Sequence, residues 1–435
     1  MPMDTQRGLA VTTNSAEVID CINHFHQQIL GYGQSAAEII NAAKQFPDNL
    51  LIQIYAAAFY LYAQENQATS IASTYLVKAE KQLRSANLRE KLLYQAITAW
   101  LKLDYEAALS IFTAIAKLFP RDTLAVKFAE WLFYCSGQAF QGKWFLSLCE
   151  SVAQVNQDES HFLATHSFAL ELCRKRPEAK AMAEKAIAMN ENTPWAHHTL
   201  AHVLLLENAI AEGITSLNQF KASWDNILSL LKSHNTWHLA LFYLANRNEE
   251  ATIQLFNGIF GTLPESCGEQ IDAISLLWRM DIAGLPQMQI LRSIIPYLGI
   301  HPYEQYTGFN NIHFIYCLAK AGENRQVNQS LESITKYCHS LPTGLTKKLW
   351  CEVNLPLCKA VGAFAQEDYG ASCKLMEPII DRCFQVGGSD AQDELFLQTY
   401  VMSLSRNKQK DKAKAFFDNH LSYYKNTALA DYWFS

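Results

Sequence analysis

A helix-pair unit that recurs along the 435-residue chain constrains its fold more than any other feature. The clearest copy of this unit runs from Arg89 to Pro120. Ala96 and Ala108 stand where two antiparallel helices approach each other closely, and the ring of Phe112 can fill the space between units. A terminal proline then stops the second helix. Because one such pair cannot bury its apolar face alone, it must stack against neighbouring pairs.

Similar helix pairs follow this unit at nearly constant spacing. One covers residues 161–192, the next begins at Pro194 and ends near Lys221, and another begins near Asn226. This arrangement is typical of tetratricopeptide repeats. Glycine (18 residues) and proline (12 residues) are scarce, and strand patterns are nearly absent. We therefore expect an all-α fold, a right-handed tetratricopeptide-type α-solenoid of antiparallel helix pairs with non-canonical C-terminal helices.

The strength of the repeat signal varies along the chain. Residues 1–85 contain helices with a weak repeat signal, residues 86–260 contain the clearest repeats, and residues 261–435 contain irregular helical repeats. In a solenoid each pair contacts mainly its neighbours, so these boundaries are soft. We expect residues 1–435 to form a single α-solenoid.

The charge and the cysteine content restrict the partners and the location. The net charge is −6, which provides no global field to attract a phosphate backbone, so we expect no nucleic-acid partner. Eleven scattered cysteines without a CxxC pair indicate a reducing compartment. The polar N-terminus lacks a secretory signal, and the longest uncharged apolar stretch is shorter than the ~20 residues that span a bilayer. These features predict a cytoplasmic protein without a membrane partner.

Histidines recur at the length of one repeat. His198 and His202 are four residues apart, as are His234 and His238, and the two pairs are offset by 36 residues. His166 precedes His202 by the same offset. A spacing of four places both side chains of a pair on one helix face. The first helices of tetratricopeptide repeats line the concave surface of the array, so we expect a histidine-lined groove or pocket there.

Three interpretations of these histidines remain open. The first is a metal site, in which a divalent ion such as zinc is ligated by His198, His202, His234 and His238. The second is a protonatable pocket that binds a polar or anionic small molecule or carries acid–base chemistry. The third is that repeat duplication copied structural histidines. Trp237 beside them either packs in the core or forms a wall of the pocket.

Several ordered motifs resemble the tetratricopeptide repeat protein 38-like family. They are Pro194–Val203 (PWAHHTLAHV), Glu212–Gly213 (EG), His234–Leu241 (HNTWHLAL), Asp272–Arg279 (DAISLLWR), Phe309–His313 (FNNIH) and Gly387–Gln392 (GGSDAQ). The resemblance implies an α-helical repeat fold whose polar motifs lie on the inner face, and it implies no established activity. Leu205, Asn311 and Asp390 depart from the family pattern, which has an acid, an aspartate and a histidine at these positions.

The resemblance also implies which residues meet in the pocket. These would be His198, His202, His234, His238, Asp272, Arg279 and His313. In an enzyme, His202 and His238 would act as the base or as ligands, and Asp272 would orient one imidazole. Arg279 would hold an anionic group, because its planar fork binds carboxylate or phosphate. The ligand-binding set would be His198, His234, Arg279, His313 and Trp237.

Two functions follow from these observations. The main prediction is a tetratricopeptide-repeat protein whose histidine-lined concave pocket binds a small polar or anionic ligand or a metal, with hydrolytic or acid–base chemistry as an extension. The alternative is a non-catalytic protein–protein interaction scaffold that binds a peptide in its concave groove.

Overall fold

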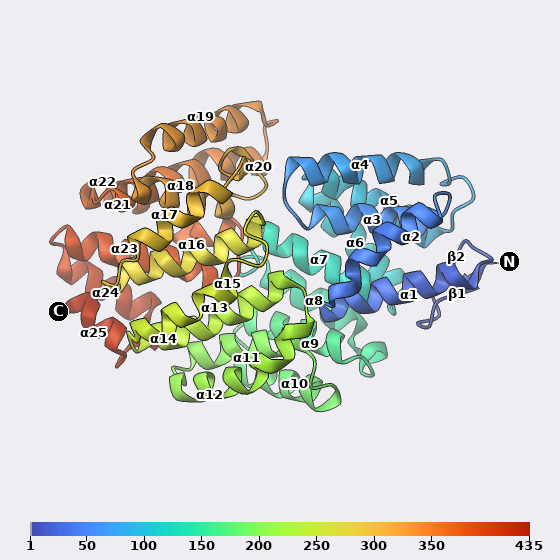
Figure 1. Ribbon diagram of the computed structural model, residues 1–435, viewed down its shortest axis with the longest axis horizontal. Coiled ribbons are helices and arrows are strands. Elements are labelled where there is room, and N and C mark those ends of the chain that lie inside the picture. The colour runs from blue at the N-terminus through green and yellow to red at the C-terminus, as the bar shows by residue number, and fades with distance from the viewer. Residues whose placement is uncertain (1) are drawn as a thin grey trace. The chain divides into compact units, whose positions relative to one another are not determined.

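The structure is a computed structural model that describes residues 2–435. Across these residues, helices follow one another along nearly the whole chain, as Figure 1 shows. Strand structure there is limited to a two-residue ladder between β1 (Met3–Asp4) and β2 (Ala10–Val11), which are antiparallel. The prediction of an all-α, tetratricopeptide-type solenoid fold is confirmed.

The chain forms two compact units. Unit 1 consists of residues 1–135, 141–200 and 223–231, and unit 2 consists of residues 136–140, 201–222 and 232–435. Two helices contribute residues to both units, α11 (Pro194–Leu206) and α13 (Ser229–Ala245). The predicted single solenoid over residues 1–435, with its graded repeat regions, stays a prediction.

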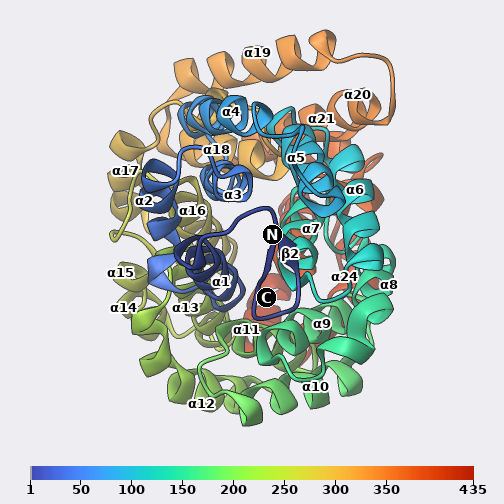
Figure 2. The same ribbon diagram turned by 90° about the vertical axis from the view of Figure 1, so that its right-hand side faces the viewer.

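Unit 1 is built from antiparallel helix pairs. Its helices are α1 (Ala16–Gly31), α2 (Glu38–Gln45), α3 (Leu50–Leu61), α4 (Asn66–Glu80), α5 (Leu88–Leu101), α6 (Tyr105–Leu118), α7 (Thr123–Cys135), α8 (Gly142–Val152), α9 (Ser160–Leu172) and α10 (Arg176–Met189), with the short 3₁₀ turns η1 (Gln34–Ala37) and η2 (Ala153–Asn156). Helices α3 and α4, α5 and α6, and α9 and α10 pack against each other in sequence order (Figures 1 and 2).

Local sequence explains where the clearest pair begins and how it packs. Asn87 caps α5 and forms a capping box with Glu90, and Asp104 caps α6. Ala96 and Ala108 are fully buried between the two helices. The caps determine where α5 and α6 begin, and the small residues allow the two helices to approach closely. Residues within the pair itself therefore explain both features.

The N-terminal helix α1 lies across the first helices of successive pairs rather than at the end of the row. It packs against α3, α7 and α9, and Figure 2 shows it between α3 and α9. The ring of Phe25 stacks on Tyr55 of α3 with centroids 5.1 Å apart. His26 Nε2 lies 2.9 Å from Thr123 Oγ1 at the start of α7. The apolar face of α1 therefore covers part of the surface that the first helices present.

Unit 2 contains the less regular helices. They are α12 (Ile210–Phe220), α14 (Glu249–Gln254), α15 (Phe256–Ile259), α16 (Cys267–Ile282), α17 (Met288–Ile294), α18 (Gly308–Ala321), α19 (Asn324–Ser340), α20 (Leu345–Leu349), α21 (Leu355–Ala365), α22 (Tyr369–Met376), α23 (Asp390–Arg406), α24 (Lys410–His420) and α25 (Ala428–Phe434).

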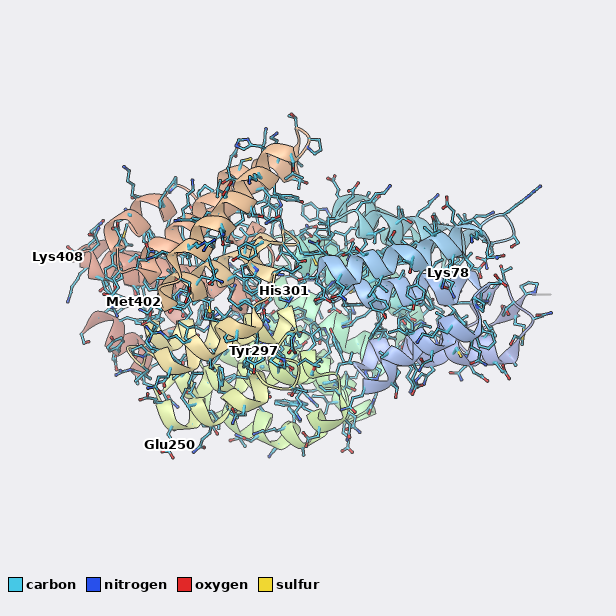
Figure 3. The ribbon with its side chains drawn as sticks, turned by 45° about the horizontal axis from the view of Figure 1, so that its top comes forward. Lys78, Glu250, Tyr297, His301, Met402 and Lys408 are labelled. Atoms are coloured by element: carbon cyan, nitrogen blue, oxygen red, sulfur yellow. The ribbon has the colours of Figure 1, made fainter. Side chains whose placement is uncertain are left out.

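Short turns join several helices of unit 2. They are the 3₁₀ segments η3 (Lys221–Asn226, which begins in unit 2 and ends in unit 1), η4 (Ile295–Tyr297), η5 (His301–Tyr303), η7 (Ile380–Gln385) and η8 (Ser422–Tyr424), and the π-helical segment η6 (Trp350–Asn354). Figure 3 labels Tyr297 and His301 on the connection between α17 and α18. Gln270 ties α16 to this connection, because its side-chain amide donates to Tyr297 O at 2.6 Å.

The close approach of α12 to α13 can be tested at Gly213. A Cβ at this position would lie 2.1 Å from Phe242 Cε1, so we expect Gly213→Ala to lower the free energy of unfolding by about 1–3 kcal/mol through overpacking. The control is Gly362→Ala within α21, where the nearest atom, Ile315 Cγ2, lies 3.4 Å away. This control should raise stability by about 0.5–1 kcal/mol. Urea unfolding checks both variants, and equal midpoints for the wild type and Gly213→Ala would contradict the packing.

Candidate functional site

Three of the predicted histidines meet in unit 2. The ring centroids of His202 and His238 are 4.7 Å apart, and those of His234 and His238 are 4.8 Å apart. His234 and His238 lie one turn apart on α13, and His202 lies on α11. His198 precedes His202 by one turn on α11 and stacks on Trp195, with centroids 4.2 Å apart. In both α11 and α13, the two histidines of a pair therefore lie one helical turn apart, as the spacing of four residues predicts.

Carboxylates from other helices hold the two outer imidazoles of this group. His202 Nδ1 donates to Asp390 Oδ1 at 2.9 Å, and His234 Nδ1 donates to Asp272 Oδ1 at 3.1 Å. Asp272 lies on α16, and Asp390 is the first residue of α23. A carboxylate at Nδ1 fixes the tautomer and directs the lone pair of Nε2 elsewhere. This chemistry suits a base or a metal ligand and suits a buried structural histidine equally well.

Burial keeps the central imidazole uncharged. His202 and His238 are fully buried. Desolvation lowers the pKa of His238 well below 6.5, and the charges of His202, His234 and Arg279 lower it further. A neutral imidazole is the form that can ligate a metal. Metal ligation by His198, His202, His234 and His238 stays a prediction.

Arg279 is engaged by α23. Its guanidinium donates to Glu394 Oε1 at 3.5 Å, to Gln398 Oε1 at 3.2 Å and to the carbonyl oxygen of Ala391 at 2.5 Å. Tyr424 also donates to Glu394 Oε1, at 2.8 Å. The planar fork of Arg279 thus joins α16 to α23, and its predicted contact with an anionic ligand stays untested.

The last two predicted residues pack among aromatic rings. His313 Nδ1 donates to the carbonyl oxygen of Phe309 at 2.8 Å, and its ring lies 5.7 Å from that of Trp278. Burial lowers the pKa of His313 to about 3. Trp237 is fully buried and stacks on His234 with centroids 5.2 Å apart, and Arg279 lies 5.4 Å from its ring.

Sequence reasoning missed a polar groove in unit 1. Two adjoining cavities of about 360 and 260 Å³ share Gln27 and His161 as lining residues. We call their combined lining the amide groove, because six of its side chains are amides. It consists of Gln6, Arg7, Gln27, Gln28, Gly31, Gly33, Arg121, Asp158, Glu159, Ser160, His161, Asn190, Asn192, Ser223, Asn226 and Ile227.

Helix α1 forms one wall of the amide groove, and the turns between consecutive repeats form the other. Arg121, Asp158, Asn190 and Asn226 come from four such turns, each just before the first helix of a pair. Gly31 allows α1 to come close to α9, since a Cβ there would lie 3.0 Å from His161 Nε2. The recurrence of polar residues in turns at the repeat period was the sequence signal that could have indicated this groove.

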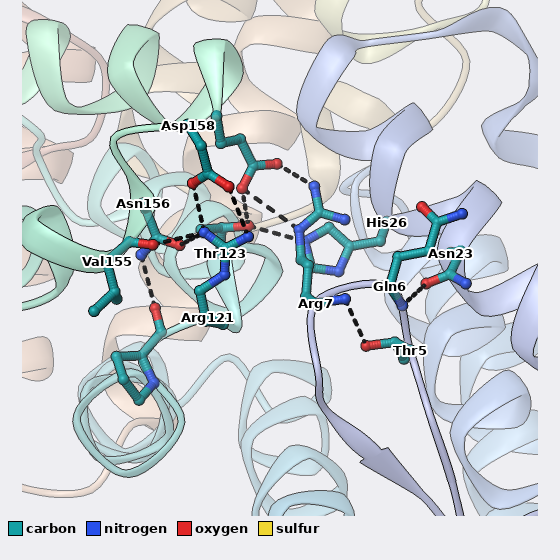
Figure 4. Close-up of polar contacts among 12 residues, drawn as sticks. Thr5, Gln6, Arg7, Asn23, His26, Arg121, Thr123, Val155, Asn156 and Asp158 are labelled. Atoms are coloured by element: carbon teal, nitrogen blue, oxygen red, sulfur yellow. Dashed lines mark hydrogen bonds and ion pairs between the residues drawn. The ribbon is translucent and has the colours of Figure 1, made fainter.

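Ion pairs hold one end of the amide groove, as Figure 4 shows. Arg121 binds Asp158 through two nitrogens at 2.6 and 3.1 Å, and Arg7 pairs with Glu159. Thr123 Oγ1 donates to Glu159 Oε2 at 2.9 Å. Two arginines and two carboxylates at this end balance each other in charge.

His161 lies where the two cavities adjoin. Desolvation lowers its pKa to about 4, and the nearby positive charges of Lys127 and Arg7 contribute. Its imidazole is therefore neutral at physiological pH and can both donate and accept hydrogen bonds.

Comparisons with known proteins add little to this picture. No protein-family model matches the chain. The solved human IFIT1 dimer with m7Gppp-AAAA is similar at 12% identity over 96% of this chain and 92% of that chain, with a TM-score of 0.41. The crystal structure of the P58(IPK) TPR domain is similar at 12% identity over 80% and 96%, with a TM-score of 0.23. At these scores, neither similarity bears on what this chain binds.

One expectation needs correction. The prediction that a nucleic-acid partner is excluded is wrong as an exclusion. That prediction rested on a net charge of −6, and the total charge of a chain does not describe the charge at one surface. Across residues 2–435, no helix combines the length and the apolar character that a membrane crossing requires.

The buried histidines make stability depend on pH. The folded-state pKa of His313 is about 3 against about 6.5 in the unfolded chain, so between these values only the unfolded chain binds the proton. The free energy of unfolding should therefore fall by about 1.4 kcal/mol per pH unit for this histidine as the pH drops below about 6.5. His313→Phe should make the slope shallower by that amount. Urea titrations at several pH values measure it.

The comparison of the wild type with His313→Phe contains an internal control at higher pH. Above about pH 7 neither state of His313 gains a proton, so the wild type and His313→Phe should have parallel profiles there. Parallel profiles below about pH 6 as well would contradict the low pKa.

Proposed function

We propose that the chain is a non-catalytic helical-repeat scaffold that binds an extended peptide in the amide groove. The observation that carries this proposal is the set of six amide side chains along the two adjoining cavities. Each amide has donor and acceptor groups, and an extended peptide backbone offers the complementary C=O and N–H groups at every residue. Amide side chains can therefore bind a peptide largely through its main chain.

The exposure of the groove supports this proposal. Gln6, Gln27, Asn192 and Asn226 are exposed, so a ligand can reach their amides. Two other amide oxygens are held by local contacts that fix their direction: Gln28 Oε1 accepts from Ser35 N, and Asn190 Oδ1 accepts from Asn192 N, each at 3.1 Å. Each wall thus has one amide whose direction is fixed before a ligand arrives, which lowers the entropy cost of binding.

The charged side chains of the groove are paired with each other, which favours a ligand that is recognised by its shape and its main-chain hydrogen bonds. Arg7 and Arg121 are already paired with Glu159 and Asp158, and the imidazole of His161 is neutral. A strongly charged ligand would have to displace these pairs. Binding should accordingly change little with salt.

A metal-binding function is a second proposal. The two carboxylate–histidine pairs, His202 with Asp390 and His234 with Asp272, support it, because metal-bound histidines usually donate their second nitrogen to such a partner. The ligand set would be His198, His202, His234 and His238, as in the sequence prediction. Elemental mass spectrometry of untagged protein tests this proposal. Near-stoichiometric zinc that disappears in the His202→Ala/His238→Ala variant would support it, and metal-free wild type would reject it.

Two finer assignments, a protein family and a cellular compartment, accompany the scaffold proposal. Membership in the tetratricopeptide repeat protein 38-like family is supported by the ordered motifs between Pro194 and Gln392. A reducing compartment such as the cytoplasm is supported by eleven cysteines without a CxxC pair.

Peptide binding is tested with a display library of short linear peptides panned on the full chain. We expect selected peptides to lose about 5- to 100-fold in affinity for the Gln27→Ala/Asn190→Ala variant, because each lost hydrogen bond costs about 0.5–1.5 kcal/mol. Gln67→Ala is the matched control, since Gln67 is an exposed amide on α4 outside the groove. Calorimetry of a selected peptide measures the change.

Two outcomes would overturn the peptide assignment. One is equal peptide affinity for the groove variant and the Gln67→Ala control. The other is a single-stranded RNA oligonucleotide that binds the wild type and is lost in the groove variant while no selected peptide binds.

A further inference from the structure

Three cysteines of unit 2 converge where α19 packs against η6 and α21. Cys338 lies in the last turn of α19, Cys351 lies in η6, and Cys358 lies on α21. Cys351 Sγ donates to the carbonyl oxygen of Cys338 at 3.8 Å. Burial and the neighbouring Cys351 raise the pKa of Cys338 to about 12.

The three thiols differ in exposure. Cys338 is 1% exposed and Cys358 is fully buried, whereas Cys351 is only half-buried. The neighbouring connection from Leu341 to Lys348 is largely exposed, and Leu345 in it is 76% exposed. A small reagent in solution therefore reaches Cys351 first.

The local backbone sets Cys351 apart from an ordinary helical cysteine. It lies in the π-helical turn Trp350–Asn354, and such turns occur often at functional positions. Lys347, one turn before it, donates to the carbonyl oxygens of His339 and Leu341 at 3.3 and 2.9 Å. This ammonium stays beside the end of α19, where its positive charge only partly offsets the rise in the pKa of Cys338.

We propose that Cys351 and Cys338 form a reversible oxidation site that hydrogen peroxide converts to a disulfide. The Cys351 thiolate attacks one peroxide oxygen, the O–O bond breaks, and the departing oxygen leaves as water after it takes up protons. The product is a sulfenic acid on Cys351. The Cys338 sulfur, after it gives up its proton, then attacks the Cys351 sulfur, and the S–O bond breaks to release a second water. Two electrons pass from the thiols to the peroxide.

Helix geometry excludes a disulfide between Cys351 and Cys358. Cys351 and Cys358 are seven residues apart along one helical stretch, which separates their Cα atoms by roughly 10 Å at ~1.5 Å per residue. A disulfide requires Cα atoms no more than about 7 Å apart. Cys338 is therefore the resolving partner for Cys351, and the bridge closes a loop around the exposed connection between α19 and η6.

Hydrogen peroxide treatment of the full chain tests this proposal. Free thiols are titrated after denaturation, and disulfide-linked peptides are identified by mass spectrometry of a non-reducing digest. We expect the wild type to lose two thiols per chain, to yield the Cys338–Cys351 peptide pair, and to recover both thiols with dithiothreitol. Cys358→Ser is the matched control and should behave as the wild type.

Variants of the pair separate the two steps. Cys351→Ser should keep the Cys338 thiol at the same peroxide dose. Cys338→Ala should stop at the sulfenic acid, which dimedone labels on Cys351. Circular dichroism of each variant checks that the fold is kept. A wild type that loses no thiols, or that yields another pair or an irreversible sulfonic acid on Cys351, would overturn the proposal, and this result does not depend on any variant folding.

Discussion

Close packing between consecutive antiparallel helices is the constraint on which the rest of the structure depends. Ala96 and Ala108 are fully buried between α5 and α6, and Gly213 leaves no space for a methyl group beside Phe242. Interiors at crystal-like density cannot take an extra atom without a shift in backbone or side chain. The small residues therefore fix the distance between helices, and this distance decides which side chains of neighbouring repeats can touch.

The same packing explains the state of the repeated histidines. The equivalent residues His166, His202 and His238 on successive helices are buried, and burial favours the neutral imidazole. A buried polar ring needs a hydrogen-bond partner, and distant carboxylates provide it: Asp390 is 188 residues from His202 in sequence. A regular histidine pattern thus signals repeated buried positions as readily as a reactive site.

Two of the proposed sites lie at the less regular places of the chain. The amide groove is formed by turns between repeats and by α1, which crosses the first helices of unit 1. The thiol pair Cys338–Cys351 lies at a π-helical turn that interrupts a helix. Turn residues and interrupted helices expose side chains that the regular faces bury, so ligands and reagents reach them first.

The sequence by itself determined the all-α repeat fold, the pair α5–α6 and the grouping of His234 with His238, because these depend on spacing within a helix or between adjacent helices. Tertiary structure decided the rest. The partners of His202, His234 and Arg279 come from α16 and α23, and the groove needs α1 to lie across repeats far along the chain. Local periodicity does not contain such long-range pairings, since many polar residues could satisfy the same buried group and packing alone selects one.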